Sequence, residues 1–550
     1  MNTFKPMLFS CLKEYNKKTL ISDIIAGIIV AVIALPLSIA LALASGVGPE
    51  EGLYTAIIAG FLIAFFGGST VQISGPTAAF ATIVAGVVAT HGLDGLIVAT
   101  IMAGVFLILM GIFRFGSLIK FIPYTITTGF TAGIAVTILV GQLKDFMGLT
   151  YADGVKPIEN VEKIEAVIHH ITTINWQAVL VGVISLAILI VWPYISKKIP
   201  GSLIAVLVGI GMVKIFDMNV NTIGDLYTVS SALPTPHIPG IDFALIRDVL
   251  PNAFTIAILA AIESLLSCVV ADGMTGTRHR SNTELIAQGI GNIGSALFGG
   301  IPATGAIART AANIKNGGKT PISGIVHAAV LLLVLVVLMP YAALIPMPVI
   351  AAVLFIVAYN MCQWRPFVSL VKSAPKSDIF VLVLTFVLTV VFDLVVAIGV
   401  GLVLACVLFM KRMSDTSSLR GWTYGDDEGE RTLPEAVRVY ELEGPLFFGS
   451  ADILASITFK PYTKALVIRM RSVSAMDATA HNALEDLCKR CNEAGIKLIL
   501  SHVNEQPMNS MIKSGLADII GRDRFCSHID EALELAVKLS EEADTVTEKL

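Results

Sequence analysis

Hydrophobic residues in this chain gather into long continuous runs separated by short polar stretches. The clearest runs cover about 24–44, 95–113, 177–195, 252–271, 322–340 and 378–410. A run of about 20 apolar residues is long enough for a helix to cross a bilayer, and the last run is long enough for two passes. The pattern therefore predicts an α-helical polytopic membrane protein in contact with the lipid bilayer.

Seven weaker or interrupted runs raise the expected number of segments to fourteen. They cover about 53–68, 73–91, 122–140, 201–216, 285–298, 303–314 and 344–359. An even number places both ends of the membrane part on the same side. Lys5, Lys13, Lys17 and Lys18 precede the first segment and Lys411 follows the last, and positive charge marks the cytoplasmic side. We expect a cell (inner or plasma) membrane protein with both termini in the cytoplasm.

Two interrupted segments resemble each other although half of the membrane part separates them. Phe-Gly-Gly at 66–68 is followed by Ser74-Gly75-Pro76-Thr77, and Phe-Gly-Gly at 298–300 is followed by Ile301-Pro302-Ala303-Thr304-Gly305. A short helix of small residues follows each break. Paired segments interrupted by Gly and Pro at corresponding positions indicate an internally repeated transporter. The repeats cover about 21–216 and 250–412.

The composition changes abruptly after Arg412. Residues 413–434 are rich in Ser, Asp, Gly and Glu and are typical of a linker. From 435 to 550 short apolar strands at about 437–442, 465–470 and 497–500 alternate with amphipathic helices at about 478–494, 506–514 and 528–540. This alternation predicts a small α/β domain in the cytoplasm.

Composition and motifs exclude several classes of function. Of the 550 residues 55% are hydrophobic and 15% are charged, and the net charge of −4 gives no reason to expect a nucleic-acid partner. The chain has no P-loop, no His-Glu-x-x-His and no Gly-x-Ser-x-Gly motif, so we expect no enzyme. The seven cysteines show no arrangement for a metal or a disulfide framework, and no cofactor is expected.

The two breaks are the candidate site for an anion. A helix that begins inside the membrane presents unpaired N–H groups and the positive end of its dipole at mid-depth. The expected donors are the backbone N–H groups of Thr77, Ala78 and Ala79 after the first break and of Ala306, Ile307 and Ala308 after the second, with hydroxyl contacts from Thr77 and Thr304. The alternative is that these small residues only allow close helix packing.

Two charged residues within apolar segments are candidates for substrate attraction and ion coupling. Arg309 lies one turn inside the second short helix and would add positive potential at the site. Glu263 lies in the middle of 252–271, where it could carry a proton, or bind Na⁺ together with Ser267 one turn further. A permanent pair between Glu263 and Arg309 is the alternative for both.

The remaining polar residues are expected to have structural roles. Asp393 falls where two segments meet and is typical of a turn or a cap. Asp272, Glu284 and the cluster 277–280 are expected to be solvent-facing charges of loops and helix ends. His327 is expected to be a packing residue whose hydrogen bonds are satisfied.

Together these motifs resemble the sulfate permease (SulP) family. The first part of the chain is similar to the family signature in Asp23, Gly27, Pro36, Ala40, Gly46, Pro49 and Gly52-Leu53-Tyr54. More specific are 282–285, Asn292, 298–302, Arg309, Asn313 and 317–320. The tail from 435 is similar to the STAS domain that follows the membrane unit in this family.

The resemblance implies an architecture and a site. It implies a seven-plus-seven inverted repeat, with a core of segments 1–4 and 8–11 and a gate of segments 5–7 and 12–14. It also implies a homodimer, elevator-like movement of the core, a substrate between segments 3 and 10, and ion coupling at an acidic residue of segment 8, here Glu263. The STAS domain implies a cytoplasmic protein partner.

The substrate and the role of the tail stay open at this point. Family members carry sulfate, bicarbonate, halides or C4-dicarboxylates, and the run 302–309 looks more like bacterial members that move carboxylates or sulfate than like the sodium-dependent bicarbonate branch, which lacks the arginine. We expect proton-coupled symport, with a passive anion channel, a nucleobase permease or a receptor as alternatives. Thr479 occupies a phosphoacceptor-like position, but the glycine that accompanies it in phosphorylated relatives is absent.

Overall fold

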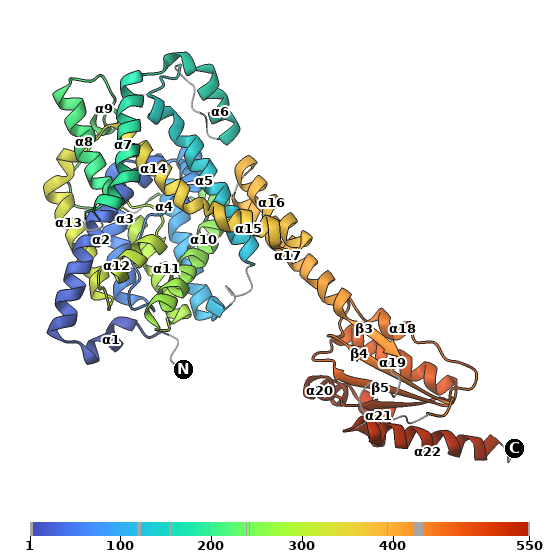
Figure 1. The fold of residues 1–550 in the computed structure, drawn as a ribbon. Coiled ribbons are helices and arrows are strands. Elements are labelled where there is room, and N and C mark those ends of the chain that lie inside the picture. Colours follow the sequence, from blue (N-terminus) through green and yellow to red (C-terminus); the bar gives the residue numbers. More distant parts are fainter. Residues whose placement is uncertain are drawn as a thin grey trace. The chain divides into compact units, whose positions relative to one another are not determined.

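The structure, a computed structural model, describes residues 4–117, 123–152, 157, 159–196, 199–237, 239–240, 242–392, 394–421 and 433–547. Two compact units divide the chain between Leu402 and Val403 (Figure 1). The first unit consists of helices, and the second unit is built around a β-sheet. Asp393, expected in a turn, lies outside the described residues.

The first half of the helical unit runs from the N-terminus to the polar stretch before residue 243. Its elements are α1 (Met7–Cys11), η1 (Leu12–Glu14), α2 (Lys17–Ala44), α3 (Pro49–Phe66), β1 (Ser74–Gly75), η2 (Ala78–Phe80), α4 (Ala81–Ile112), α5 (Tyr124–Met147), α6 (Asn160–His169), η4 (Ile171–Thr173), α7 (Trp176–Ile195), α8 (Gly201–Ile215) and α9 (Ile223–Leu226).

The second half repeats this order of long and interrupted helices. Its elements are α10 (Phe243–Thr275), α11 (Ser281–Leu297), β2 (Thr304–Gly305), α12 (Ile307–Lys315), α13 (Ile322–Ala342), α14 (Met347–Cys362), α15 (Trp364–Ser373), α16 (Lys376–Val391) and α17 (Leu394–Thr416).

The fourteen expected segments are present in the part of the chain that the structure describes. Nine helices there are long and apolar enough to cross a membrane. One of them, α4, is interrupted at Gly92, whose φ of 67° is outside the helical region, so it supplies two segments. The shorter helices α8, α11, α12 and α16 supply the rest. Large apolar side chains such as Leu180, Val183 and Ile190 on α7 are exposed, as expected for a surface in contact with lipid.

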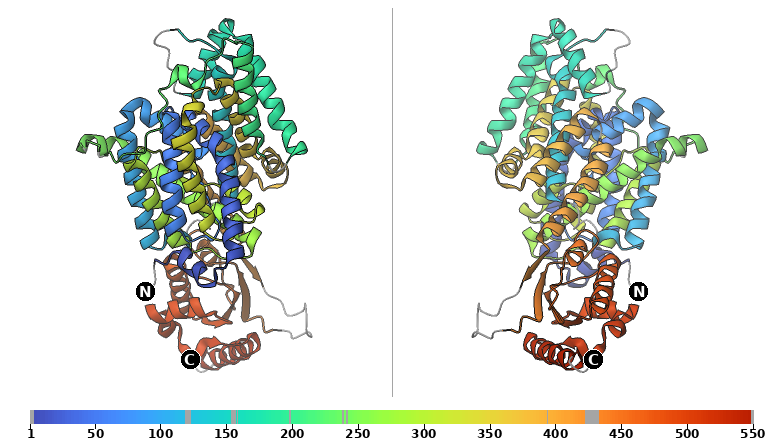
Figure 2. Two further views of the ribbon diagram at one scale, coloured as in Figure 1. Left: turned by 90° about the vertical axis from the view of Figure 1, so that its left-hand side faces the viewer. Right: turned by 90° about the vertical axis from the view of Figure 1, so that its right-hand side faces the viewer.

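The two halves run in opposite directions where their breaks meet. β1 and β2 pair antiparallel, with Ser74 opposite Gly305 and Gly75 opposite Thr304. Elsewhere helices of the two halves are interleaved, as the adjacent blue and yellow-green helices of Figure 2 show. α11 packs on α3 and α4, and α13 packs on α2 and α3, whereas α14 and α16 pack on α5. This confirms an inverted repeat whose helices form a core group and a gate group.

Glycine permits the closest of these contacts. A Cβ atom on Gly104 of α4 would lie 2.7 Å from the carbonyl oxygen of Gly289 on α11, and a Cβ on Gly289 would collide with the carbonyl of Gly104. The two backbones are thus in direct contact, which is how small residues let membrane helices approach each other.

The second unit is a five-stranded sheet with helices on both faces. Its order is β3-β4-β5-β6-β7, where β3 is antiparallel to β4 and the other pairs are parallel. One apolar face packs on α19 to α21, and the other packs on α22. The elements are β3 (Ser418–Gly421), β4 (Val437–Glu443), α18 (Asp452–Ala455), β5 (Ala465–Ser472), α19 (Ala478–Glu493), β6 (Lys497–Ser501), α20 (Glu505–Ser514), α21 (Leu516–Ile520), η5 (Arg522–Arg524), β7 (Phe525–Cys526) and α22 (Ile529–Thr547).

The linker expected at 413–434 differs from the structure in its first part. Helix α17 continues to Thr416, and residues 418–421 form the edge strand β3. Four residues are too few to show an apolar alternation, so this strand was not predicted from the sequence. Residues 422–432 lie outside the described part.

Candidate functional site

The two breaks lie side by side and hold each other through their backbones. Besides the β1–β2 pairing, the N–H of Ala306 donates to the carbonyl oxygen of Ile73 at 2.9 Å. Two residues separate the end of β1 from the start of η2 at Ala78, and one residue separates the end of β2 from the start of α12 at Ile307. The starts of two helices therefore lie close together inside the helical unit.

The expected set of backbone donors needs one correction. Ala306 was expected to offer its N–H to a ligand, but this group is used in the bond to Ile73. The first N–H groups of a helix have no partner within that helix, so Ala78 and Ala79 at the start of η2 and Ile307 and Ala308 at the start of α12 remain candidates, as does Thr77 just before η2. In the second break, the N–H of Ala306 therefore joins the two halves and is not free to bind a ligand.

Glu284 fixes the chain that leads into the first break. Its carboxylate is buried and accepts hydrogen bonds from the N–H groups of Gly68 (2.8 Å) and Ser69 (3.3 Å), and from the amides of Gln72 (2.8 Å) and Gln288 (2.9 Å). The expectation that Glu284 is a solvent-facing charge was wrong. An acidic residue in the first turn of a helix is typical of an exposed helix start, and three of its four partners are more than 200 residues away in the chain.

Asn292 and Thr55 fix the second break in a similar way. The side chain of Asn292 donates to the carbonyl of Ala303 at 2.9 Å and accepts from its N–H at 2.8 Å. The hydroxyl of Thr55 accepts from the N–H of Ile301 at 2.7 Å. Buried polar groups thus hold both breaks in a defined geometry, because an unpaired buried amide would be costly.

Arg309 connects the second short helix to the first break. Its Nη2 donates to the carbonyl of Pro76 at 2.6 Å, and its side chain is almost fully buried. Nη1 has no hydrogen-bond partner among the described residues and lies where a Cβ atom on Gly75 would be 2.6 Å away. No carboxylate forms an ion pair with Arg309 in the described part, so its charge lies at the breaks without a protein counter-ion.

Glu263 lies on α10 at the same place. Its Oε2 accepts a hydrogen bond from the hydroxyl of Thr77 at 2.9 Å, and both residues are half-buried. The alternative of a permanent Glu263–Arg309 pair is not observed among the described contacts. The structure therefore brings Thr77, Glu263 and Arg309 together around Pro76.

Two hydroxyl groups proposed for ligands are used inside the protein. The hydroxyl of Thr304 lies 2.6 Å from that of Ser264 and donates to the carbonyl of Ala260 at 3.2 Å. The hydroxyl of Ser267 donates to Thr310 at 3.3 Å, and Thr310 in turn accepts from the N–H of Ile73. Thr304 and Ser267 are fully buried, so their contacts tie α10 to the breaks.

His327 differs from its expected role as a satisfied packing residue. It is fully buried on α13, but neither ring nitrogen has a hydrogen-bond partner among the described residues. Its Nδ1 lies 3.9 Å from the position of a Cβ atom on Gly60, beside the carbonyl of Ser74. Two polar side chains close to β1 thus have nitrogen atoms without a hydrogen-bond partner among the described residues, His327 and Arg309.

The accessible part of this arrangement suits a small anion. Thr77, Glu263 and Ile307 are half-buried and Ala308 is exposed, whereas Arg309 is buried behind them. Helix starts, a hydroxyl and an uncompensated guanidinium all favour negative charge. No group of three or more metal-ligating side chains occurs among the described residues.

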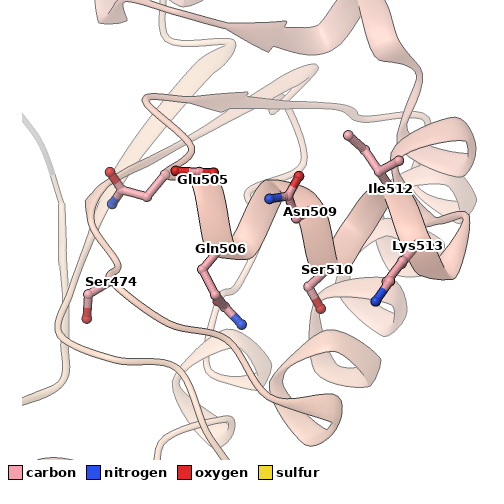
Figure 3. A pocket seen from close by; sticks show the side chains of 8 residues that line it. Ser474, Glu505, Gln506, Asn509, Ser510, Ile512 and Lys513 are labelled. Atoms are coloured by element: carbon pink, nitrogen blue, oxygen red, sulfur yellow. The ribbon is translucent and has the colours of Figure 1, made fainter. Parts of the chain in front are cut away.

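The second unit carries a shallow surface cavity of about 1030 Å³ on α20 (Figure 3). The side chain of Gln506 there bonds the backbone of Met476 in both directions, at 2.8 and 3.1 Å. Asp477 accepts from the N–H of Ala480 at 2.9 Å and so caps α19, which leaves Thr479 exposed in the first turn.

Inverted repeats and broken helices that meet at their starts, followed in the chain by an α/β domain, define a polytopic membrane transporter. A model of the sulfate permease family matches residues 20–385, and a model of the STAS domain matches residues 431–532. The chain therefore belongs to the sulfate permease family and carries a C-terminal STAS domain, as the sequence motifs predicted.

Relatives of known name cover nearly the whole chain. It is 42% identical to "Putative sulfate transporter YvdB" of Bacillus subtilis (strain 168), over 94% of this chain and 98% of that protein. It is 32% identical to "Bicarbonate transporter BicA" of Picosynechococcus sp., over 94% of both chains. These names describe transporters, which confirms the expectation that the chain is no enzyme.

Solved structures show the same fold. The overall structure of SLC26A9 matches with a TM-score of 0.87 at 20% identity and covers 98% of this chain and 93% of its own. The transmembrane domain of a cyanobacterium bicarbonate transporter BicA matches with a TM-score of 0.62 at 30% identity, over 71% of this chain and 98% of that chain.

Proposed function

We propose that the protein is a secondary active transporter that carries a small oxyanion together with a proton, with sulfate, bicarbonate or a small carboxylate as the substrate. The observation that carries the proposal is the buried guanidinium of Arg309, which has no carboxylate partner among the described residues. A buried charge needs compensation, and an anion at the starts of η2 and α12 would supply it. The names of the relatives, which mention sulfate and bicarbonate, support this class of substrate.

The contact between Thr77 and Glu263 supports proton coupling. An anion bound at the N–H of Thr77 would lie close to the Glu263 carboxylate, since the two residues share a hydrogen bond. Two negative charges at such a distance repel each other strongly in a medium of low dielectric constant. Binding of the anion would therefore favour binding of a proton by Glu263. Sodium bound at Glu263 could replace the proton, but the hydroxyl of Ser267 is engaged with Thr310.

The experiment that tests this proposal is uptake of labelled sulfate, bicarbonate and fumarate into liposomes that hold the purified protein. An inward proton gradient should drive accumulation of at least one of these anions. Glu263→Gln should abolish accumulation but permit exchange of the anion across the membrane. Glu165→Gln on the exposed helix α6 is the matched control and should behave like the wild type.

Three results would contradict parts of the proposal. Accumulation that requires sodium at constant pH would exclude proton coupling. A flux that never accumulates substrate against a gradient would favour an anion channel. Unchanged accumulation by Glu263→Gln would remove the coupling role of this residue while leaving the anion site in place.

We further propose a homodimer with both termini in the cytoplasm and transport by movement of the core helices against the gate helices. The lysines near the N-terminus and Lys411 support this orientation. Most core helices pack on other core helices and most gate helices on other gate helices, with α2 as the main contact between the groups, and this arrangement supports relative movement. A cysteine scan with a membrane-impermeant reagent on intact cells tests the orientation, because labelling at either terminus from outside would contradict it.

A further inference from the structure

A cavity of about 360 Å³ lies at the end of α5, away from the two breaks. It is enclosed by the last turn of α5, the following residues to Ala152, the first turn of α7, the chain around Asn221 and the first turn of α14. This volume falls in the range of pockets that hold small molecules.

The walls of this cavity are joined by hydrogen bonds between distant parts of the chain. The N–H of Asn175 donates to the carbonyl of Met147 at 3.0 Å, and the N–H of Met347 donates to the carbonyl of Asn221 at 2.9 Å. The side chain of Asn175 also caps α7 through the N–H of Gln177 at 3.0 Å. The cavity is therefore preformed and does not depend on a free loop.

Two charged residues line the cavity, the acidic Asp145 and the basic Lys144. The carboxylate of Asp145 lines it and has no hydrogen bond or ion pair with the described residues. Lys144 forms no ion pair with Asp145 in the described part, and its ammonium lies over the ring of Tyr151, 4.9 Å from the ring centre, at the same cavity. The C-terminal end of α5 adds the negative end of a helix dipole.

The remaining lining is partly apolar and partly polar. Its apolar part includes Leu149, Val220, Leu226, Met347 and Pro348, and its polar part includes Thr150, Tyr151, Asn175 and Asn221. A metal ion of the calcium or magnesium type would require several oxygen ligands, and the described residues hold no group of three metal-ligating side chains. A carboxylate without a partner beside apolar side chains instead suits an organic cation with methyl or methylene groups around its charge.

We propose that this cavity binds a small organic ammonium ion, whose charge is held by Asp145 and whose carbon atoms contact the apolar lining. The bound cation would contact the end of α5 and the start of α14, two gate helices that pack on each other. The proposal concerns a second site and does not depend on the anion that the protein carries.

The test uses tetramethylammonium chloride and choline chloride as probes on the purified full-length protein. Thermal unfolding should shift upward in a saturable way with either probe and not with sodium chloride at the same ionic strength, since a ligand that binds the native state stabilises it. Asp145→Asn should weaken the affinity for the probe at least tenfold. Asn221→Phe, which places a large ring at the exposed side of the cavity, should have a similar effect and serves if Asp145→Asn does not fold.

Asp94→Asn is the matched control, because Asp94 is an exposed acid outside the cavity. It should keep the response of the wild type. An equal response of Asp145→Asn and the wild type would overturn the proposal, as would a response to sodium chloride as large as that to the two probes. No shift with either probe would also overturn it. None of these measurements uses transport, so their outcome is separate from the test of anion uptake.

Discussion

The hydroxyl of Thr77 donates a 2.9 Å hydrogen bond to the carboxylate of Glu263, although 186 residues separate them in the chain. Thr77 ends the first break, and Glu263 lies in the middle of α10. A residue whose backbone N–H is a candidate anion donor is thus the hydrogen-bond partner of the candidate proton acceptor. Through this contact, binding of the anion would change the affinity of Glu263 for a proton, and binding of the proton would change the affinity for the anion.

Replacing Thr77 should alter the coupling of the two ions. Thr77→Val keeps the shape and the backbone but removes the hydroxyl, and a hydrogen bond to a charged group contributes about 1.5–3 kcal/mol. We expect the pH at which uptake is half-maximal to rise by about one unit or more, since the ionised carboxylate loses a donor that stabilises it. The pH profile of uptake measures this effect. Thr77→Ser, which retains the hydroxyl, should restore the wild-type profile, whereas an unchanged profile in Thr77→Val would show that the contact has no part in coupling.

Arg309 should be required for anion affinity, and another positively charged side chain should not replace it. Its Nη2 bonds the carbonyl of Pro76, and a lysine ammonium has neither the reach nor the planar fork to repeat this contact. We expect Arg309→Lys to raise the KM for the anion about tenfold and Arg309→Met to abolish saturable uptake. Both variants should be compared with Arg247→Lys on α10, which lies outside the breaks. A KM for Arg309→Met close to that of the wild type would remove Arg309 from the site.

The sequence singles out those parts of the candidate site that depend on local chemistry. Gly and Pro mark the two breaks directly, and the apolar surroundings of Glu263 and Arg309 single out their charges. It failed for Glu284, whose position in a first turn looks like an exposed helix start. It also did not indicate that the hydroxyls of Thr304 and Ser267 have hydrogen-bond partners inside the protein. Which hydroxyl faces a ligand and which faces another helix depends on the packing of the two repeats, and a linear pattern does not contain this information.

The same limit on prediction from sequence applies to the C-terminal domain. Long apolar strands and amphipathic helices were predicted close to their observed bounds, as for β5 and α19. The edge strands β3 and β7 were missed because they have four and two residues, and each is a strand only through its neighbour. Short strands are defined by pairing, whereas long ones show their own periodicity.

Glu284 should be a determinant of stability and not of transport chemistry. Glu284→Gln replaces one accepting oxygen with an NH₂ group. This NH₂ group would face N–H donors that the carboxylate accepts in the wild type. A buried donor left unpaired costs about 1–3 kcal/mol, so we expect the unfolding temperature of the purified protein to fall by several degrees relative to Glu165→Gln. Intact transport by the fraction that stays folded would agree with a structural role. A variant as stable as the control would show that the four hydrogen bonds are replaceable.

Cys491 in the STAS domain gives a test that needs no transport. Burial against the core, together with the nearby Cys488, raises the pKa of its thiol to about 12. Because the thiolate is the reactive form, iodoacetamide at about pH 8 should leave Cys491 unmodified in the native protein and modify it after unfolding, where the pKa returns to about 8.5. Peptide mass spectrometry reads both states.

The same difference in pKa makes the stability of the domain depend on pH. Above about pH 8.5 the unfolded chain releases the Cys491 proton while the folded domain retains it, so deprotonation favours the unfolded state and stability falls as pH rises. Cys491→Ala should lower the stability at neutral pH, because it leaves a small cavity, but should flatten its decline between about pH 8 and 10. Cys526→Ala, at a partly exposed thiol, is the control and should flatten the decline less. An equal decline in the wild type and in Cys491→Ala would show that this thiol ionises no differently in the folded and the unfolded chain.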